Sequence, residues 1–92
     1  MRVQLNYFAQ IRQAAAADNL SLDLPDNATV SQALQLAVDR HGDAFRKLIF
    51  DDAGRPRPSV ILLVNGTPAA GGGESVLKNG DNVSIFSPVA GG

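Results

Sequence analysis

The chain has 92 residues, 45% of them apolar and 18% charged, which indicates one small globular domain. Eight basic and nine acidic residues give a net charge of −1, so the basic excess of a nucleic-acid-binding protein is missing. The chain has no cysteine, which excludes disulfides, thiolate catalysis and metal sites built on sulfur. It has one histidine, His41, so metal sites built on several histidines are excluded as well. No apolar run approaches the roughly 18 residues of a membrane span, and the first residues lack a signal peptide's apolar block. We therefore expect a cytoplasmic protein with no membrane partner.

The first part of the chain predicts two strands. Apolar and polar residues alternate over residues 2–9, with Phe8 falling on the polar side of the pattern. The alanine-rich residues 10–18 could form a helical turn or a loop. Residues 20–24 alternate again, and the turn-forming cluster 25–27 ends this second strand.

Residues 30–41 carry the clearest helical pattern. Thr29 is the expected N-cap, Gln32 completes a capping box, and Gly42 is the expected stop after the last turn. The apolar stripe comprises Val30, Ala33, Leu34, Ala37, Val38 and His41.

The middle of the chain predicts a short helix, a loop and a buried strand. Residues 43–50 suit a helix capped by Asp43, and the glycine and prolines of 51–58 indicate a loop. Residues 59–64 form a continuous apolar run, which is typical of a strand that is well covered. The dipeptide 65–66 is Asn-Gly, a strong signal for a hairpin.

The last part predicts a brief return strand, a break and a final strand. Residues 67–70 suit the return strand, and the three glycines of 71–73 suggest a flexible connector. Residues 82–87 alternate once more, with Phe86 on the polar side, and Pro88 ends the strand.

This order of elements predicts an α+β fold. A hairpin, a helix and further strands pack most simply as a mixed sheet with the main helix across one face, which is the ubiquitin-like β-grasp. We expect residues 1–87 to form this domain and residues 88–92 to be a flexible C-terminal tail.

Three groups of residues suggest chemistry but lack what it requires. Asp51 and Asp52 have no further metal ligands nearby in sequence, which favours a solvated turn. The glycines of 71–73 are followed by Glu74, which would repel a phosphate. His41 has no evident nucleophile to pair with, so a half-buried residue at the helix end is the simpler interpretation.

The C-terminal residues suit a carrier. Pro88 prevents the strand from continuing, and Val89 and Ala90 are small. Gly91 and Gly92 lack Cβ atoms, so they could pass through a narrow channel and bring the terminal carboxylate to a buried reaction centre. The alternative is a frayed terminus that happens to end in small residues.

The two displaced phenylalanines support the carrier interpretation. In a β-grasp sheet the first and last strands are parallel neighbours, so Phe8 and Phe86 would lie side by side on the exposed face. An aromatic pair on a polar face suggests a protein partner. The alternative is that segment 10–18 or 67–76 covers one of the rings.

The sequence resembles the MoaD/ThiS sulfur-carrier family along its whole length, and its start is similar to the molybdopterin-synthase small-subunit branch. The motifs that carry the resemblance are Tyr7-Phe8-Ala9-Gln10-Ile11-Arg12, Val64-Asn65-Gly66, Asn79-Gly80-Asp81-Asn82-Val83 and Ile85-Phe86-Ser87-Pro88-Val89-Ala90-Gly91-Gly92.

The resemblance implies a carrier protein that is not itself an enzyme and binds no cofactor. A ubiquitin-activating-type adenylyltransferase would adenylate the Gly92 carboxylate with ATP, and sulfur from a donor protein would then convert it to a thiocarboxylate. The acceptor would be the molybdopterin synthase large subunit or another enzyme. Phe8, Phe86 and Arg12 match partner-contact positions, and residues 88–91 would enter the partner with Gly92.

Other functions stay open. Related carriers supply sulfur for cysteine or thiamine synthesis, although thiamine carriers usually lack a segment like 43–58. Other relatives modify proteins by forming isopeptide bonds with lysines. A plain interaction module with an inert tail is the remaining alternative.

Overall fold

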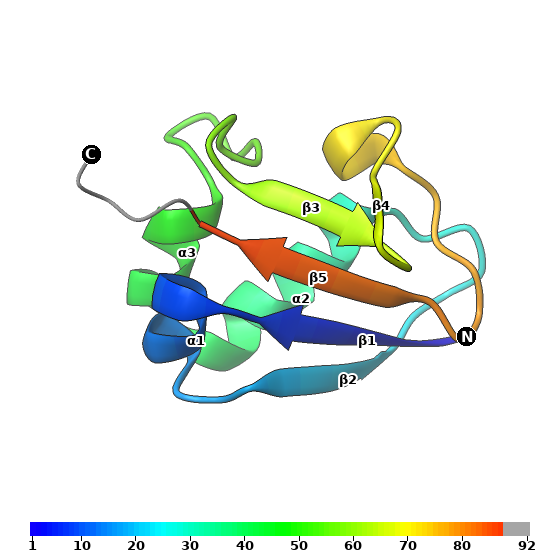
Figure 1. The fold of residues 1–92 in the computed structure, drawn as a ribbon, viewed down its shortest axis with the longest axis horizontal. Coiled ribbons are helices and arrows are strands. Elements are labelled where there is room, and N and C mark those ends of the chain that lie inside the picture. Colours follow the sequence, from blue (N-terminus) through cyan, green and yellow to red (C-terminus); the bar gives the residue numbers. More distant parts are fainter. Residues whose placement is uncertain (88–92) are drawn as a thin grey trace.

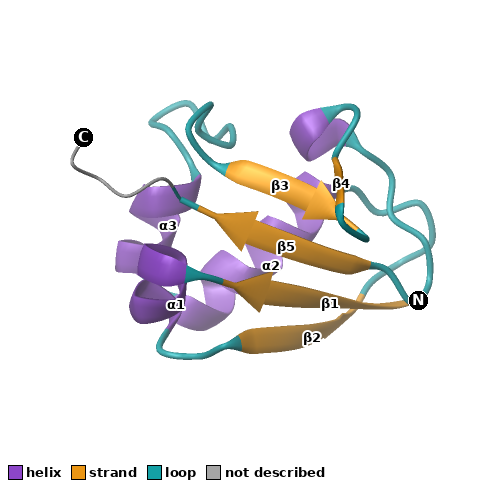
Figure 2. Cartoon of the chain, viewed as in Figure 1, coloured by secondary structure: helices purple, strands orange, loops and turns teal. Residues whose placement is uncertain are grey.

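The computed structural model describes residues 1–87. Figures 1 and 2 show a sheet with the helices gathered on one face of it. The elements are, in chain order, β1 (Arg2–Tyr7), α1 (Ala9–Ala15), β2 (Asn19–Asp23), α2 (Val30–His41), α3 (Asp43–Ile49), β3 (Ile61–Val64), β4 (Thr67–Pro68), the 3-10 helix η1 (Gly72–Glu74) and β5 (Asn82–Phe86).

The five strands form one mixed sheet in the order β2-β1-β5-β3-β4. β1 and β5 are parallel, with Leu5 opposite Val83 and Tyr7 opposite Ile85. The other neighbours, β1–β2, β3–β5 and β3–β4, are antiparallel. This topology, with α2 across one face, confirms the predicted ubiquitin-like β-grasp fold.

Helix α2 begins and ends as its sequence predicts. The Gln32 backbone N–H donates to Thr29 Oγ1 at 3.3 Å, and the Thr29 N–H donates to Gln32 Oε1 at 2.8 Å. These two bonds form the capping box and satisfy donors that the first turn leaves unpaired. Gly42 stops the helix with a φ of +95°, a backbone conformation that favours glycine.

The core lies between the sheet and the helices. The predicted apolar stripe of α2 is buried from Val30 to Val38, and Phe45 and Ile49 of α3 are fully buried. The strands contribute Val3, Leu5, Tyr7, Leu62, Val83 and Ile85. No charged side chain is buried among residues 1–87, and apolar packing holds most of this core together.

Two local predictions are corrected. Gly42, and not Asp43, is the N-cap of α3, while Asp43 lies in the first turn and forms ion pairs with Arg46 and Lys47. A carboxylate in the first turn still favours the helix, because it faces the positive end of the helix dipole. The predicted flexible connector at 71–73 instead enters the ordered helix η1.

The connector is ordered because it packs against other elements. A Cβ atom added to Gly73 would collide with Ser31 Oγ at the start of α2 and with Pro56 in the 51–58 loop. This close approach requires a glycine at position 73.

Over residues 1–87, none of the helices has the length and apolar character to cross a bilayer.

Candidate functional site

The predicted aromatic pair lies where β1 and β5 end. Because Tyr7 is opposite Ile85 in the parallel register, the next residues, Phe8 and Phe86, become neighbours. Their rings stack with centroids 4.4 Å apart and planes 7° apart. Phe8 is 39% exposed and Phe86 is half-buried, so no described segment covers the pair completely. The structure therefore confirms that the two rings lie side by side on the open face of the sheet.

A third apolar side chain extends this pair, and sequence analysis missed it. β3 is antiparallel to β5 with Ile61 opposite Phe86, and Ile61 is 49% exposed. The prediction that 59–64 is well covered is therefore wrong for this residue. We call Phe8, Phe86 and Ile61 the apolar row.

The sequence carries no local signal for the exposure of Ile61, which follows from its pairing with Phe86 in the sheet. Residues directly opposite each other in a sheet project on the same face, so the exposure of Phe86 implies the exposure of Ile61. The run of apolar residues in 59–64 hides the alternation that would otherwise separate the two faces of the strand.

The apolar row lies next to the C-terminal end of the described chain. Phe86 is the last residue of β5 and Ser87 follows it, at the end of the sheet where α1 and α3 also lie (Figure 1). The predicted tail residues, Pro88, Val89, Ala90, Gly91 and Gly92, lie outside the described residues.

Arg12, the predicted basic contact, lies near the row on α1. This helix follows Phe8 directly, and the backbone N–H of Arg12 donates to the carbonyl of Phe8 at 3.4 Å. Its guanidinium Nε is 3.9 Å from the Asp18 carboxylate, and both side chains are largely exposed. An exposed pair at this distance holds the side chain only weakly, so the guanidinium is accessible to another molecule.

A buried aromatic cluster supports β1 just before the row. The Tyr7 hydroxyl lies 2.9 Å from His41 Nε2, and the Tyr7 ring meets Phe45 edge-on with centroids 5.3 Å apart. Burial raises the pKa of the Tyr7 hydroxyl above its usual value. Burial, aided by the charge of Arg40, lowers the pKa of His41. A neutral imidazole and a neutral phenol thus form a structural hydrogen bond, as the half-buried interpretation of His41 predicts.

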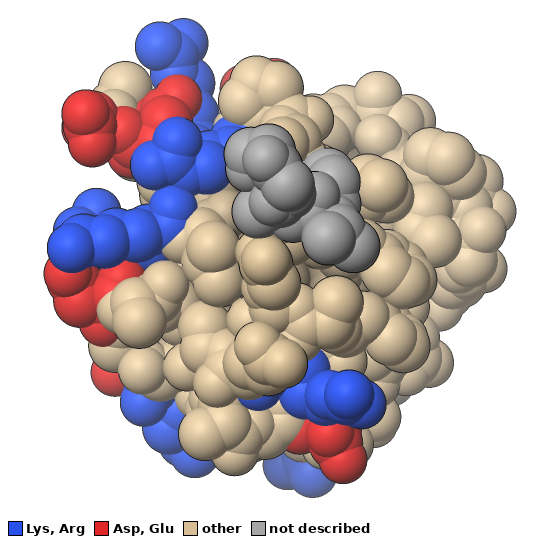
Figure 3. Space-filling view, turned by 60° about the vertical axis from the view of Figure 1, so that its left-hand side comes forward, with Lys and Arg blue, Asp and Glu red and all other residues tan. Residues whose placement is uncertain are grey.

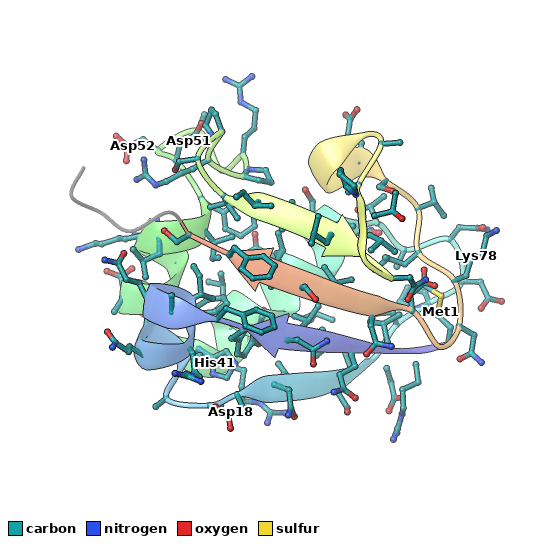
Figure 4. All side chains as sticks on the ribbon, in the orientation of Figure 1. Met1, Asp18, His41, Asp51, Asp52 and Lys78 are labelled. Carbon is teal, nitrogen blue, oxygen red and sulfur yellow. The ribbon has the colours of Figure 1, made fainter. Side chains whose placement is uncertain are left out.

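The remaining candidate residues form no catalytic group. Asp51 Oδ1 accepts the backbone N–H groups of Ala53 and Arg55 at 2.9 and 3.0 Å, and these bonds help to lower its pKa. Asp52 is exposed (Figure 4). Asp51 therefore shapes the turn, as the sequence indicates. Within the described part of the chain, no cluster of three or more histidine, aspartate or glutamate side chains is arranged to hold a metal.

Charge is distributed unevenly around this end of the molecule. In Figure 3, lysine, arginine, aspartate and glutamate side chains lie along the left and lower margins of the visible face, and its central and right-hand parts are largely uncharged. Depletion of charged side chains at the centre of a surface is typical of the core of a protein–protein interface. The apolar row is therefore partly exposed beside Ser87, the last residue that the structure describes.

The fold and this surface define a ubiquitin-like carrier or modifier protein. The model of the ThiS family matches residues 5–92, and the chain belongs to that family. The small archaeal modifier protein 3 of Haloferax volcanii is 33% identical over 94 residues, an alignment that covers all of both chains.

Solved structures agree with this assignment. The crystal structure of SAMP1 from Haloferax volcanii matches with a TM-score of 0.90 and 29% identity, covering all of both chains. A Pyrococcus furiosus protein assigned as subunit 1 of a molybdopterin converting factor matches with a TM-score of 0.76 and 32% identity, covering 97% of this chain and 99% of the other.

Proposed function

We propose that this protein is a sulfur carrier whose Gly92 carboxylate is adenylated and then converted to a thiocarboxylate. The observation that carries the proposal is the stacked pair of Phe8 and Phe86 beside the residue that leads into the Gly-Gly terminus. Gly92 is five residues beyond Ser87 in the chain. An enzyme that binds Gly92 therefore comes close to the apolar row. The ThiS-family match over residues 5–92 supports the same chemistry.

The chemistry explains why a partner and ATP are needed. A carboxylate is a poor electrophile, and the oxygen it would lose is a poor leaving group. An adenylyltransferase corrects both by forming a mixed anhydride between the Gly92 carboxylate and AMP, releasing pyrophosphate. The terminal sulfur of a persulfide on the donor protein then attacks the carbonyl carbon and AMP leaves, which gives an acyl disulfide between the two proteins. A thiol attacks the donor's sulfur in this disulfide, forms a new disulfide with it and releases the Gly92 thiocarboxylate. This chain contributes the carboxylate and the docking surface, and its partners perform catalysis.

Within this class we propose the molybdopterin synthase small subunit. The support is the likeness to the Pyrococcus furiosus protein, at 32% identity over 97% of this chain. In this role the apolar row and Arg12 contact the large subunit, while Gly92 delivers sulfur to a pterin precursor. Co-purification with the large subunit, lost on Phe86→Asp, would support this branch.

Intact mass measurement tests the carrier chemistry. The protein is incubated with ATP, the adenylating enzyme of its own cell, a persulfide donor and a thiol reductant. The expected product is heavier by the difference between sulfur and oxygen, with the change located at Gly92. A variant lacking Gly91 and Gly92 is the control and should stay unmodified while unfolding at the wild-type temperature. An unchanged mass, with an enzyme shown to activate another carrier, would overturn the proposal.

Protein modification is the second candidate. It is supported by the relative that is 33% identical along the full chain and is called a small archaeal modifier protein. In that function a lysine amine of the target, and not sulfur, attacks the activated Gly92. Conjugates that survive boiling in detergent and reductant, and that disappear when Gly91 and Gly92 are deleted, would favour it.

A further inference from the structure

A cleft of about 490 Å³ lies beside β3, and the apolar row forms no part of it. Its walls are the loop of residues 54–58 and the glycine-rich turn of residues 71–74, which lie near the start and the end of β3 (Figure 1). Val60 and Leu62 line the cleft between these walls. They flank Ile61 in the chain, and successive side chains of a strand point to opposite faces. The cleft therefore lies on the face of β3 opposite to the row.

Packing holds the walls of the cleft in place. A Cβ atom on Gly73 would collide with Ser31 Oγ and with Pro56, so the turn, the start of α2 and the loop meet at this glycine. Because Gly71, Gly72 and Gly73 have no side chains, the main chain of another molecule can approach this wall closely. A cleft with fixed walls also costs a ligand little ordering of the protein.

Arg57 is held more firmly than a surface arginine usually is. Its backbone N–H donates to the Ile49 carbonyl at 2.7 Å, and its carbonyl accepts the Val60 N–H at 3.0 Å. Its side-chain Nε donates to the Lys47 carbonyl at 2.7 Å. The bond through Nε leaves the Nη groups as donors, so the guanidinium is oriented and can still bind an anion.

Arg55 adds a second guanidinium to the same wall. Over residues 1–87, no carboxylate lies within ion-pair distance of Arg55 or Arg57. The Asp51 carboxylate in this loop instead accepts the backbone N–H groups of Ala53 and Arg55. Glu74 is the one carboxylate among the described residues that line the cleft. Two positive charges thus face one negative charge, and the cleft favours a ligand that brings a carboxylate.

We propose that the cleft is a second docking site, which binds an extended segment of a partner protein that carries an acidic side chain. The carboxylate pairs with Arg55 and with the oriented guanidinium of Arg57, and small apolar side chains beside it contact Pro58 and Val60. The main chain of the segment lies along the glycine-rich turn. The volume is in the range of sites that hold whole molecules, so a peptide segment suits the cleft better than a single inorganic anion. The site does not involve Gly92, so it is independent of the proposed adenylation.

A chemical-shift titration of the full-length, isotopically labelled protein tests this site. The probe is a capped peptide of alternating glutamate and valine, and the matched control peptide has glutamine in place of glutamate. The glutamate peptide should shift the resonances of residues 54–60 and 71–74, and its binding should weaken as salt is added. The glutamine peptide should bind roughly fivefold more weakly or worse. Equal affinities, or shifts confined to other surfaces, would overturn the inference.

A pair of arginine variants identifies the side chain responsible. The hydrogen bonds of Arg55 use its backbone, so Arg55→Gln should fold normally and weaken the glutamate peptide by roughly threefold or more. Arg40→Gln is the matched control, because it removes the same charge from an exposed position in the last turn of α2, outside the cleft. An equal loss in both variants would show that net charge, and not the cleft, attracts the peptide.

Inorganic phosphate separates peptide recognition from the binding of a small anion. If phosphate shifts the same resonances and displaces the glutamate peptide at an equal concentration, the cleft recognises small anions and the inference is overturned. Peptide binding that persists in this mixture supports it. The mass measurement at Gly92 does not involve the cleft, so the failure of one proposal leaves the other standing.

Discussion

Large apolar side chains lie on both faces of the sheet at β1, β3 and β5, but they are buried on the inner face and exposed on the outer face. Tyr7 and Ile85 point inward and are 2% and 0% exposed, whereas their successors Phe8 and Phe86 point outward onto the open face. β3 repeats the contrast, with Leu62 9% exposed and Ile61 49% exposed. The inner face meets α2 and α3, and helices cover no part of the outer face in Figure 1.

This difference in exposure separates the residues that stabilise the fold from those that are available to another molecule. Burying a large apolar side chain stabilises a fold by about 1.5–3 kcal/mol, and an exposed ring forfeits much of that gain. The inner residues therefore account for stability. The apolar row is partly exposed, so it should contribute less to stability, and we expect it to gain most when another molecule covers it. Substitutions on the two faces should consequently affect different measurements.

The largest expected effect is on the inner face. Ile85→Ala leaves a cavity in a fully buried site and should lower the free energy of unfolding by about 2–5 kcal/mol. Chemical denaturation measures this loss. Partner affinity, measured where the variant is still folded, should stay close to that of the wild type. A loss below about 1 kcal/mol would mean that the two faces are not energetically distinct.

The adjacent residue should behave in the opposite way. Phe86→Asp places a charge at the centre of the apolar row and should weaken binding to the adenylating enzyme by roughly 30-fold or more, as expected for an interface hot spot. Calorimetric titration measures the affinity. The melting temperature should stay nearly unchanged, and a large drop would show that the ring belongs to the core.

Ile61→Ser tests the residue that the sequence did not reveal. It should weaken the same binding by roughly tenfold, because Ile61 contributes less contact area than an aromatic ring. Ser21→Asp is the matched control, since Ser21 lies on the same face but on β2, away from the row. Equal effects of the two variants would mean that the row has no special role.

The smallest expected effect is a dependence of the free energy of unfolding on pH, caused by His41. Because the pKa of His41 is lowered in the fold, the unfolded chain binds a proton more readily. The stability from this group is therefore fully present above its ordinary pKa of about 6.5 and is lost as the pH falls through the lower folded value. Thermal unfolding between pH 8 and pH 5 measures the change, and His41→Gln should reduce its slope.

The pH window separates this histidine from the carboxylates whose pKa values are shifted. Asp23, Asp43 and Asp51 have lowered pKa values because they accept hydrogen bonds, so they titrate below that window. A slope that persists unchanged in His41→Gln would assign the effect to another group.

Local sequence determined the elements whose signals lie within a few residues. The capping box of Thr29 and Gln32 and the stop at Gly42 define α2, because helix ends are satisfied by nearby groups. The alternation in β1 and β5 identified their inner faces and the displaced Phe8 and Phe86. The Gly-Gly terminus and the family resemblance are likewise read from the sequence alone.

Tertiary structure decided what depends on partners distant in sequence. The exposure of Ile61 follows from its pairing with Phe86, 25 positions later, and a uniform apolar run carries no record of that register. The order at Gly73 follows from packing against Ser31 and Pro56. Sequence patterns report local periodicity, whereas pairing and packing bring distant residues together.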